Sequence, residues 1–342
     1  MIEQDVSPSA LPEHATNARV PGLSAPSIGM PSLLDEAWRL EPFVHPFTFS
    51  AFFSPEDTLL CVLAADAART LLPDASPAIA ELTSGSGLIG LYLILRDRGA
   101  SLLGLDIDSE AARVAESNAR LLGVSSRARF ARSDLWAAST LELLKAAKPQ
   151  LLVCNPPYVP EPPGTTMQIE AGAGPHGTAH LLRALELARA LRPEALALSW
   201  CSLSDPAAVV TAAEAAGYQL AELYVSAIAD GEYSGSVHWY LRNLKDCFIN
   251  EQPETLEIIA TDGSARFAYL LFAGAFRRSE RPQSASSTVR GVCEDFARDG
   301  VRTLAGREAP FPLHCSLLTR WDELRLRMLL HGEIPRAART VT

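Results

Sequence analysis

The sequence predicts an α/β protein with a doubly wound, mostly parallel sheet of seven strands, flanked by an N-terminal arm and a helical C-terminal extension. Three observations support this fold class. Short apolar runs alternate with helical patterns from residue 78 onward, as in successive βαβ units. The run "QLLVCN" (150–155) is apolar on both faces, which suits a parallel strand covered by helices on both sides. Glycines stand at several of the expected helix ends.

The individual elements have their own signals. The stretch "SPEDTL" (54–59) begins a helix, with proline early and acids in the first turn. A helix at 109–123 has Ser109 as candidate N-cap and Gly123 at its end. The other strands are expected at 78–84, 101–107, 128–134, 194–200, 218–226 and 265–276, and the other helices at 87–99, 139–148, 179–191 and 205–217.

The chain divides into four expected regions. Residues 1–30 are rich in Pro, Ser and Ala without periodicity, which indicates a flexible arm. Residues 31–77 form an N-terminal substrate or lid segment, whose aromatic stretch "HPFTFSAFF" either covers the substrate or seals the sheet edge. The main domain is expected at 78–278, with an insertion at about 230–262. Residues 279–342 form a linker, at 279–290, and a helical extension.

Composition narrows the class of function. A formal net charge of −10 argues against nucleic acid as the main partner, because such binding usually needs a basic face. The six cysteines are dispersed, without a CxxC pair or a signal peptide, and indicate reduced thiols in a cytoplasmic protein. No stretch is long and apolar enough to span a membrane. His176 and His180 stand at i and i+4, but no third ligand supports a metal site.

A loop of small residues follows the first expected strand, in "ELTSGSGLIG" (81–90). Gly85 and Gly87 allow a tight turn and a close approach of the backbone to a ligand at the positive end of a helix. Asp106 stands 19 residues beyond Gly87, near the ~20-residue spacing at which an acid meets a ribose hydroxyl. Together these features favour a nucleoside cofactor over a plain glycine-containing turn.

The acid that opens this loop narrows the choice of nucleoside. Glu81 repels a phosphate but can accept hydrogen bonds from an ammonium group, which fits the methionine end of S-adenosylmethionine. Asp134, at the tip of the third strand, can accept a hydrogen bond from an adenine amino group, and Leu135 can pack beside the ring. The sequence therefore predicts S-adenosylmethionine as the cofactor and no metal.

The stretch "LLVCNPPYVP" (151–160) ends the fourth strand in a stiff polar turn. The Asn155 side-chain oxygen and the Pro156 carbonyl can accept both N–H bonds of a planar nitrogen, so that its lone pair faces the methyl group. Tyr158 offers a flat face to the same planar group. Catalysis then comes from orientation and electrostatic stabilisation. A rigid strand end without chemistry is the alternative.

In this order, "ELTSGSG", "LDID", "SDLW" and "NPPYVP" resemble the HemK/PrmC branch of class I methyltransferases, over roughly residues 50–276. That family methylates the side-chain amide nitrogen of glutamine in translation release factors, and NPPY also serves adenine and cytosine amino-group methylases. The resemblance implies a Rossmann-like fold and S-adenosylmethionine. Expected cofactor contacts are Glu81, Thr83, Gly85, Gly87, Asp106, Ile107, Asp134, Leu135 and Asn155. Asn155, Pro156 and Tyr158 are the expected catalytic residues.

Substrate contacts are expected beyond these motifs. The candidates are Tyr158, Glu170 in the acidic glycine-rich loop, and Tyr233, His238 and Trp239 in the insertion, with core packing as the alternative for the last three. The family begins its first loop with Asp-Leu-Gly, whereas this chain has Glu81-Leu82-Thr83, and Thr83 crowds the methionine end. The termini also differ from the release-factor enzymes, which indicates a rebuilt substrate site.

Three functions are consistent with these residues. The first is an N-methyltransferase that acts on an amide or amino nitrogen of a protein glutamine or a small metabolite. The second is a nucleic-acid amino-group methylase of the adenine N6 type, which requires a basic groove at the strand ends. The third is a non-catalytic scaffold that kept the fold but lost turnover. Thr83, in place of the family's glycine, is the residue that favours this alternative. The oligomeric state stays open.

Overall fold

The computed structural model describes residues 29–38, 54–73, 76–229, 231–244, 249 and 267–318. Almost all of the expected arm, the aromatic stretch at 45–53, part of the insertion and the chain beyond residue 318 lie outside these ranges. Within the described residues, no helix is long and apolar enough to cross a membrane.

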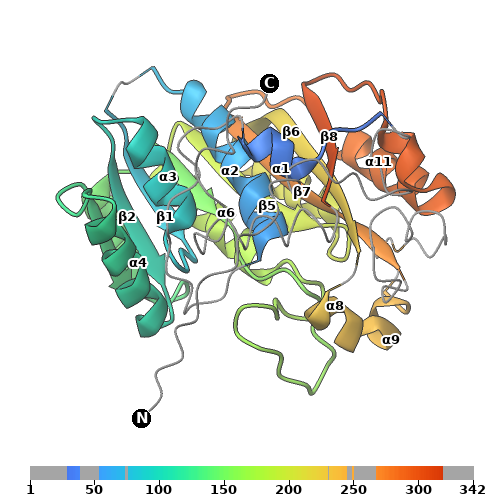
Figure 1. Ribbon diagram of the computed structural model, residues 1–342, viewed down its shortest axis with the longest axis horizontal. Helices are drawn as coiled ribbons and strands as arrows, with labels where there is room; N and C mark the ends of the chain where they lie inside the picture. The colour runs from blue at the N-terminus through green and yellow to red at the C-terminus, as the bar shows by residue number, and fades with distance from the viewer. Residues whose placement is uncertain are drawn as a thin grey trace, which may run out of the picture.

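A single mixed sheet forms the centre of the molecule (Figure 1). Its strand order is β3-β2-β1-β4-β5-β7-β6-β8. Strand β7 runs antiparallel to both β5 and β6, and the other neighbours pair in parallel. The strands are β1 Ala78–Leu82, β2 Ser101–Asp106, β3 Ala128–Arg132, β4 Leu151–Cys154, β5 Ala195–Cys201, β6 Tyr218–Ala229, β7 Ala268–Arg278 and β8 Leu313–Leu317.

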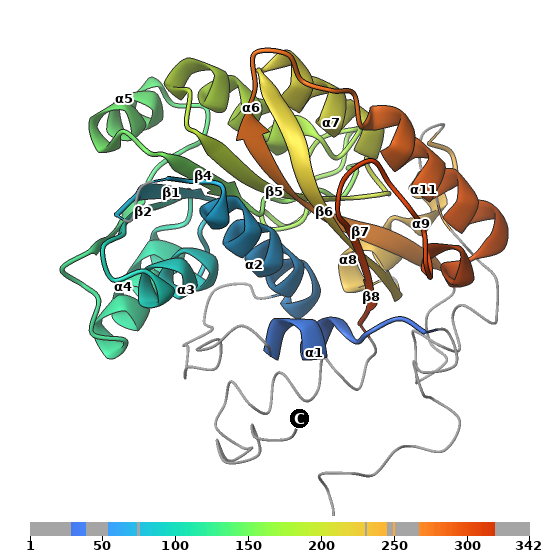
Figure 2. The ribbon, with the colours of Figure 1, turned by 90° about the horizontal axis from the view of Figure 1, so that it is seen from above.

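Helices cover both faces of this sheet, which confirms the doubly wound prediction (Figure 2). One face carries α1 Leu33–Trp38, α2 Pro55–Thr70, α3 Leu88–Arg96 and α4 Ser109–Leu121. The other carries α5 Ala138–Ala147, α6 Ala179–Leu191, α7 Pro206–Ala215 and α11 Ser286–Asp299. Each face buries its own apolar cluster. Two short helices, α8 Glu232–Ser236 and α9 His238–Leu241, belong to the insertion, and a 3₁₀ helix spans Val301–Leu304.

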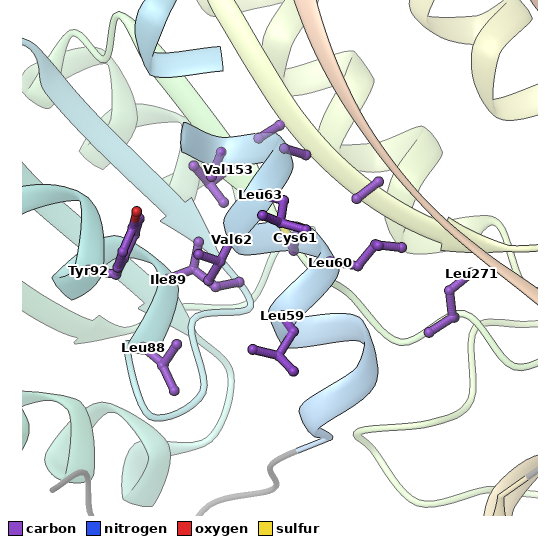
Figure 3. Close-up of a cluster of buried hydrophobic side chains, with 14 of the residues drawn as sticks. Leu59, Leu60, Cys61, Val62, Leu63, Leu88, Ile89, Tyr92, Val153 and Leu271 are labelled. Atoms are coloured by element: carbon purple, nitrogen blue, oxygen red, sulfur yellow. The ribbon is translucent and has the colours of Figure 1, made fainter. Parts of the chain in front are cut away.

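Helix α2 anchors the region before the sheet to the first face. It begins after Ser54 with proline in its first turn, as the sequence predicts. Its apolar residues are almost entirely buried. Figure 3 shows α2 between Ile89 of α3 on one side and Leu271 of β7 on the other. The packing brings the N-terminal end of α2 to the carboxyl ends of β1 and β4, where the functional residues lie.

An eighth strand corrects the prediction of seven. Strand β8 pairs in parallel with β6, because β7 inserts between β5 and β6 and leaves the other edge of β6 free. A paired edge strand removes a row of open backbone groups. This strand lies inside the region that was expected to be a linker and helical extension.

Helix α11 begins inside the expected linker at residues 279–290. Its buried residues are Val289, Val292, Cys293 and Phe296, at helical spacing. Most of these buried residues lie beyond the serine-rich stretch. The composition of residues 279–290 therefore indicates a linker and gives no sign of the helix. The helix packs against α7 and closes the second apolar cluster.

The start of α4 differs by one residue from the prediction. Asp108, not Ser109, is the N-cap, and its side chain accepts a hydrogen bond from the Glu110 amide. Both residue types cap helices well, so the sequence alone does not separate them. The helix ends at Leu121 with Leu122 as C-cap, and Gly123 follows with φ of +69°, where the sequence predicts the stop.

Candidate active site

A cavity of about 380 Å³ opens at the carboxyl ends of β1, β2, β3 and β4. This is where ligands bind in open α/β sheets. Ten of the predicted site residues line it: Glu81, Thr83, Gly85, Asp106, Ile107, Asp134, Leu135, Asn155, Pro156 and Glu170. The cavity thus brings together four strand ends that are far apart in the sequence.

Five predicted residues do not line this cavity: Gly87, Tyr158, Tyr233, His238 and Trp239. Gly87 serves the fold instead. It is the N-cap of α3 with φ of +76°, and a Cβ there would come within 2.7 Å of the Phe130 ring. Glycine is therefore required by the turn and by the packing of Phe130.

Glu81 lies at the end of β1 beneath the first turn of α3. Its side chain is 2% exposed, and its Oε2 accepts a hydrogen bond of 3.1 Å from the Gly90 amide. A Cβ at position 90 would lie 2.6 Å from this oxygen, so glycine makes room for the carboxyl. Burial, with a smaller contribution from the nearby Asp106 carboxylate, raises the pKa of Glu81 to about 8.

Asp106 ends β2 and faces the same loop. Its two carboxylate oxygens accept hydrogen bonds from the amides of Gly85 (2.8 Å) and Asp108 (2.9 Å). Burial is the largest cause of its raised pKa, and the two amides oppose that shift. Each oxygen keeps a lone pair for a further donor, such as a ribose hydroxyl.

The end of β3 supplies the wall for a flat ring. Leu135 is buried there, while Ile107, the residue after β2, is exposed. Asp134 Oδ1 accepts the Trp136 amide at 2.9 Å. Trp136 and His180 also line the cavity, with ring centroids 4.8 Å apart in an edge arrangement. Sequence reasoning missed both, although Trp136 directly follows the predicted Asp134-Leu135 pair.

His180 has no metal-binding partners in the described residues, where no cluster of His, Cys, Asp and Glu could hold a metal. Burial lowers its pKa, so the imidazole is neutral at pH 7. It belongs to the wall beside Asp134 rather than to a pair with His176.

Asn155 follows β4 directly and is held on two sides. Ser199 of β5 donates a hydrogen bond from its hydroxyl to Asn155 Oδ1. The Thr83 hydroxyl lies 3.2 Å from the Asn155 main-chain oxygen. Pro156 and Pro157 continue along the cavity wall. Ser199 carried no signal in the sequence, because a serine within an apolar strand is an ordinary core residue.

Tyr158 does not line the cavity. It is 8% exposed, and its side chain hydrogen-bonds with Asp57 of α2. The expected flat face for a substrate is therefore buried in the first apolar cluster. The reason is α2, which packs over the turn, and its position is invisible in the local pattern "NPPY".

Asp57 takes a place on the cavity wall, together with Ser54 and Thr58. Its carboxyl is 5% exposed and receives hydrogen bonds from Ser54, Tyr158 and the Thr58 amide. Burial nevertheless raises its pKa to about 6. Sequence reasoning assigned this residue only to a helix start.

The insertion reaches the cavity through Glu170. The Tyr233 hydroxyl of α8 donates to Glu170 Oε1 at 2.7 Å, and the Tyr240 hydroxyl donates to the Pro175 carbonyl at 3.1 Å. Figure 1 shows α8 beside the loop that follows β4. His238 stacks on Phe267 with centroids 4.2 Å apart, and Trp239 is 61% exposed.

The cavity is strongly acidic. Its lining contains six carboxyl groups, on Asp57, Glu81, Asp106, Asp108, Asp134 and Glu170. No lysine or arginine stands among the described residues that line it. Such a cavity attracts a cation and repels a phosphate.

The residues present fit S-adenosylmethionine, which carries a sulfonium and an ammonium group. Two buried polar atoms on the cavity wall, Ser84 Oγ and His180 Nδ1, have no hydrogen-bond partner among the described residues. Unsatisfied buried polar atoms are rare and are commonly explained by an absent ligand or water. Glu81 would face the ammonium group, Asp106 the ribose, and Asp134 and Leu135 the adenine.

Comparison with known proteins agrees with this geometry. Residues 64–171 match the family model of the methyltransferase small domain. The release factor glutamine methyltransferase of Chlorobaculum tepidum is 41% identical over 95 residues, which cover 28% of this chain and 32% of that protein. The same enzyme from Rhodospirillum rubrum is 43% identical over 95 residues, with 28% and 27% covered. The chain thus spans about a third or less of the length of these relatives.

Among solved structures, the ribosomal protein L11 methylase of Lactobacillus delbrueckii subsp. bulgaricus covers 66% of this chain and 81% of its own, at 16% identity and a TM-score of 0.38. A likeness this weak says nothing about the substrate. The chain carries a class I S-adenosylmethionine-dependent methyltransferase domain of the methyltransferase small type, with distant, partial homology to the release factor glutamine methyltransferases.

Proposed function

We propose that this protein transfers the methyl group of S-adenosylmethionine to a planar amide or amino nitrogen, on a protein glutamine or a small metabolite. The observation that carries the proposal is the position of Asn155 and Pro156. Both residues line the same cavity as Glu81, Asp106 and Asp134, the expected cofactor residues. The homology to glutamine methyltransferases supports this acceptor chemistry.

The chemistry follows from what the residues can bind. An amide nitrogen is a poor nucleophile because its lone pair is delocalised, so orientation decides the rate. When bound, the cofactor supplies an electrophilic methyl group on a sulfonium. Asn155 Oδ1 and the Pro156 carbonyl accept the two N–H bonds and stabilise the positive charge that develops on the nitrogen. The N–CH3 bond forms as the S–CH3 bond breaks, the thioether S-adenosylhomocysteine is the leaving group, and the methylated nitrogen returns to neutrality by losing one N–H proton to water. The prolines have no N–H, so they add no competing donor.

Acidic walls favour this acceptor over nucleic acid. The substrate end of the cavity holds Asp57 and Glu170, both of which repel a phosphate backbone. A nucleic-acid amino-group methylase needs basic side chains along this end to neutralise phosphates. We therefore place a protein or small-molecule acceptor ahead of an adenine or cytosine base.

We also propose that substrate recognition is divided between two regions. The segment at 31–77 contributes Ser54, Asp57 and Thr58 from the start of α2. The insertion at about 230–262 contributes through Tyr233 and its bond to Glu170. In this proposal His238 and Trp239 lie farther out, where a larger substrate extends beyond the cavity.

A methyl-transfer assay tests the proposed function. Purified protein is incubated with methyl-labelled S-adenosylmethionine and cell extract, which is then separated into protein, nucleic-acid and small-molecule fractions. We expect label in the protein or small-molecule fraction. The Asn155→Ala variant should lose about 100-fold or more in rate, because the nitrogen is no longer oriented, while its affinity for the cofactor stays within a few-fold of the wild type.

Asp106→Ala is the matched variant on the cofactor side. It should weaken cofactor binding measured by calorimetry, whereas Asn155→Ala should not. Label in the nucleic-acid fraction would favour the base methylase instead. If the wild-type protein does not bind S-adenosylmethionine at all, both enzyme functions are wrong and a non-catalytic scaffold remains.

A further inference from the structure

Thr83 has an unusual backbone conformation for its residue type. Its φ is +52°, in the left-handed region that a β-branched residue rarely adopts. The other described non-glycine residues with positive φ are Lys148 and Arg192, which cap the C-terminal ends of α5 and α6. That position commonly takes a left-handed residue. Thr83 instead lies directly after β1, where a glycine would be free of strain.

The strained conformation places the Thr83 hydroxyl against the turn after β4. Its Oγ1 lies 2.5 Å from the Leu82 carbonyl oxygen and 3.2 Å from the Asn155 carbonyl oxygen. The hydroxyl can donate its single proton to either oxygen, and Oγ1 also lies 3.8 Å from Cys154 Sγ. Because β1 and β4 pair last at Leu82 and Cys154, the side chain extends their connection by one residue. A glycine at position 83 would have no group to do this.

Ser199 of β5 lies next to Asn155 on the side opposite Thr83. Strands β4 and β5 pair last at Cys154 and Leu198, so Ser199 is the next residue along β5, as Asn155 is along β4. Its hydroxyl donates to Asn155 Oδ1 and also hydrogen-bonds with the Cys61 thiol of α2. Ser199 is 1% exposed, so this hydrogen bond is shielded from water.

Asn155 thus lies between Thr83 and Ser199. Each of the three directly follows the last residue of its strand that pairs between β1 and β4 or between β4 and β5. Thr83 holds its main-chain oxygen and Ser199 holds its side-chain oxygen. An amide oxygen has two lone pairs, so Asn155 Oδ1 keeps one for a substrate N–H. The contact from Ser199 also keeps the oxygen, rather than the amide NH₂, at this position.

We infer that Thr83 and Ser199 are positioning residues. Thr83 fixes the Asn155 main chain, which leads directly into Pro156, and Ser199 fixes Asn155 Oδ1, so that the two oxygens proposed to accept the N–H bonds keep their orientation. The inference rests on the proposed function for its consequence in turnover. The inference gives a role to Thr83, which stands where the family's Asp-Leu-Gly loop has a glycine. In this role the strained backbone at φ of +52° is what brings the hydroxyl to Asn155.

Steady-state methyl transfer with Thr83→Gly, Thr83→Ser and Ser199→Ala tests this role. Thr83→Gly removes the hydroxyl and the strain together, so we expect an unchanged or higher Tm and a kcat about tenfold lower. Thr83→Ser, which restores the hydroxyl, should recover most of that loss. Ser199→Ala should also lower kcat about tenfold. In all three variants the dissociation constant for S-adenosylmethionine should stay within twofold of the wild type.

Two control variants separate positioning from general effects. Lys148→Gly removes the backbone strain of a left-handed residue that lies outside the cavity, and it should leave kcat unchanged. Ser226→Ala removes a buried strand hydroxyl that has no partner among the described residues and lies outside the cavity, and should also leave kcat unchanged. If Thr83→Gly keeps the wild-type kcat, or if it changes only the affinity for the cofactor, the inference is wrong.

A second measurement does not depend on turnover. The side-chain NH₂ resonances of Asn155, assigned by their absence from Asn155→Ala, should be a single sharp pair in the wild type bound to S-adenosylhomocysteine. Ser199→Ala should broaden or split them, while Ser226→Ala should not. If no fraction takes up label but the resonances respond in this way, the proposed function fails and the positioning contact stands. Unchanged resonances in Ser199→Ala overturn the contact itself.

Discussion

At the scale of single residues, Glu81 has a protonation equilibrium that couples to the cofactor. Its pKa of about 8, raised by burial, means that the carboxyl is mostly protonated at pH 7 in the free protein. An ammonium group beside it favours the carboxylate and lowers that pKa. Binding of S-adenosylmethionine in the proposed orientation must therefore release a proton.

Calorimetry in buffers of different ionisation enthalpy measures this proton. At pH 7 we expect the wild-type protein to release close to one proton per S-adenosylmethionine bound. Glu81→Gln keeps the acceptor for the Gly90 amide but has no proton to lose, so the release should disappear. Equal release from the two proteins would show that Glu81 does not pair with the ammonium group.

Most of the predicted site residues that line the cavity lie at or just after strand ends. Glu81, Asp106, Asp134 and Asn155 each follow or end a parallel strand, and parallel strands bring their ends to one edge. Asp57 was not predicted as a cavity residue, because its position on the cavity wall depends on how α2 packs against the sheet, which no local sequence pattern encodes. The burial of Tyr158 depends on the same packing.

At the scale of elements, alternation of strands and helices was enough to predict strands β1 to β7 and helices α3 to α7. Strand β8 was not predicted, and the start of helix α11 was expected to be linker, because β8 is short and α11 begins in serine-rich sequence. Strand β8 gains its stability by pairing with β6, and α11 by packing on α7. Tertiary contacts decide such elements more than local propensity does. The insertion is a similar case, because its short helices α8 and α9 join the loop after β4 through side-chain bonds.

The bond between Tyr233 and Glu170 connects the insertion to the cavity and can be tested alone. Tyr233→Phe removes the hydroxyl that donates a hydrogen bond to Glu170. The Glu170 side chain, on the cavity wall at the proposed substrate end, is then no longer held in place. We expect the KM for the methyl acceptor to rise about three- to tenfold, with the affinity for S-adenosylmethionine unchanged.

Tyr224→Phe is the matched control for this change. Its hydroxyl bonds to Glu222 on β6 and does not line the cavity. It should leave the KM for the acceptor at the wild-type value. A Tyr233→Phe protein with unaltered acceptor KM would restrict the insertion to a structural role.

At the scale of the whole molecule, the acidic cavity opposes the stability of the free protein. Burial raises the pKa of Asp57 to about 6 and of Glu81 to about 8, and it also raises the pKa of Asp106 and, outside the cavity, that of Asp66. Each of these groups binds its proton more tightly in the folded state than in the unfolded chain. Protonation therefore favours folding, and ionisation with rising pH weakens it.

The free energy of unfolding should accordingly rise as the pH falls from 8 to 6.5. For Glu81, whose ordinary pKa is 4.5, the gain over this interval is about 2 kcal/mol. Below this interval His180 acts in the opposite direction, because its lowered pKa makes protonation favour the unfolded chain. Glu110 and Asp295 have lowered pKa values, which affect stability only in more acidic solution.

Urea unfolding at pH 8, 7 and 6.5, with wild type and Glu81→Gln side by side, measures the effect. The wild type should gain about 2 kcal/mol across the interval, and Glu81→Gln should lose most of that pH dependence while it is more stable than the wild type at pH 8. With S-adenosylhomocysteine bound, the wild-type gain should shrink, since the ligand's ammonium group keeps Glu81 ionised. A wild-type stability that is flat or falls from pH 8 to 6.5 would mean that Glu81 is not held protonated in the folded protein.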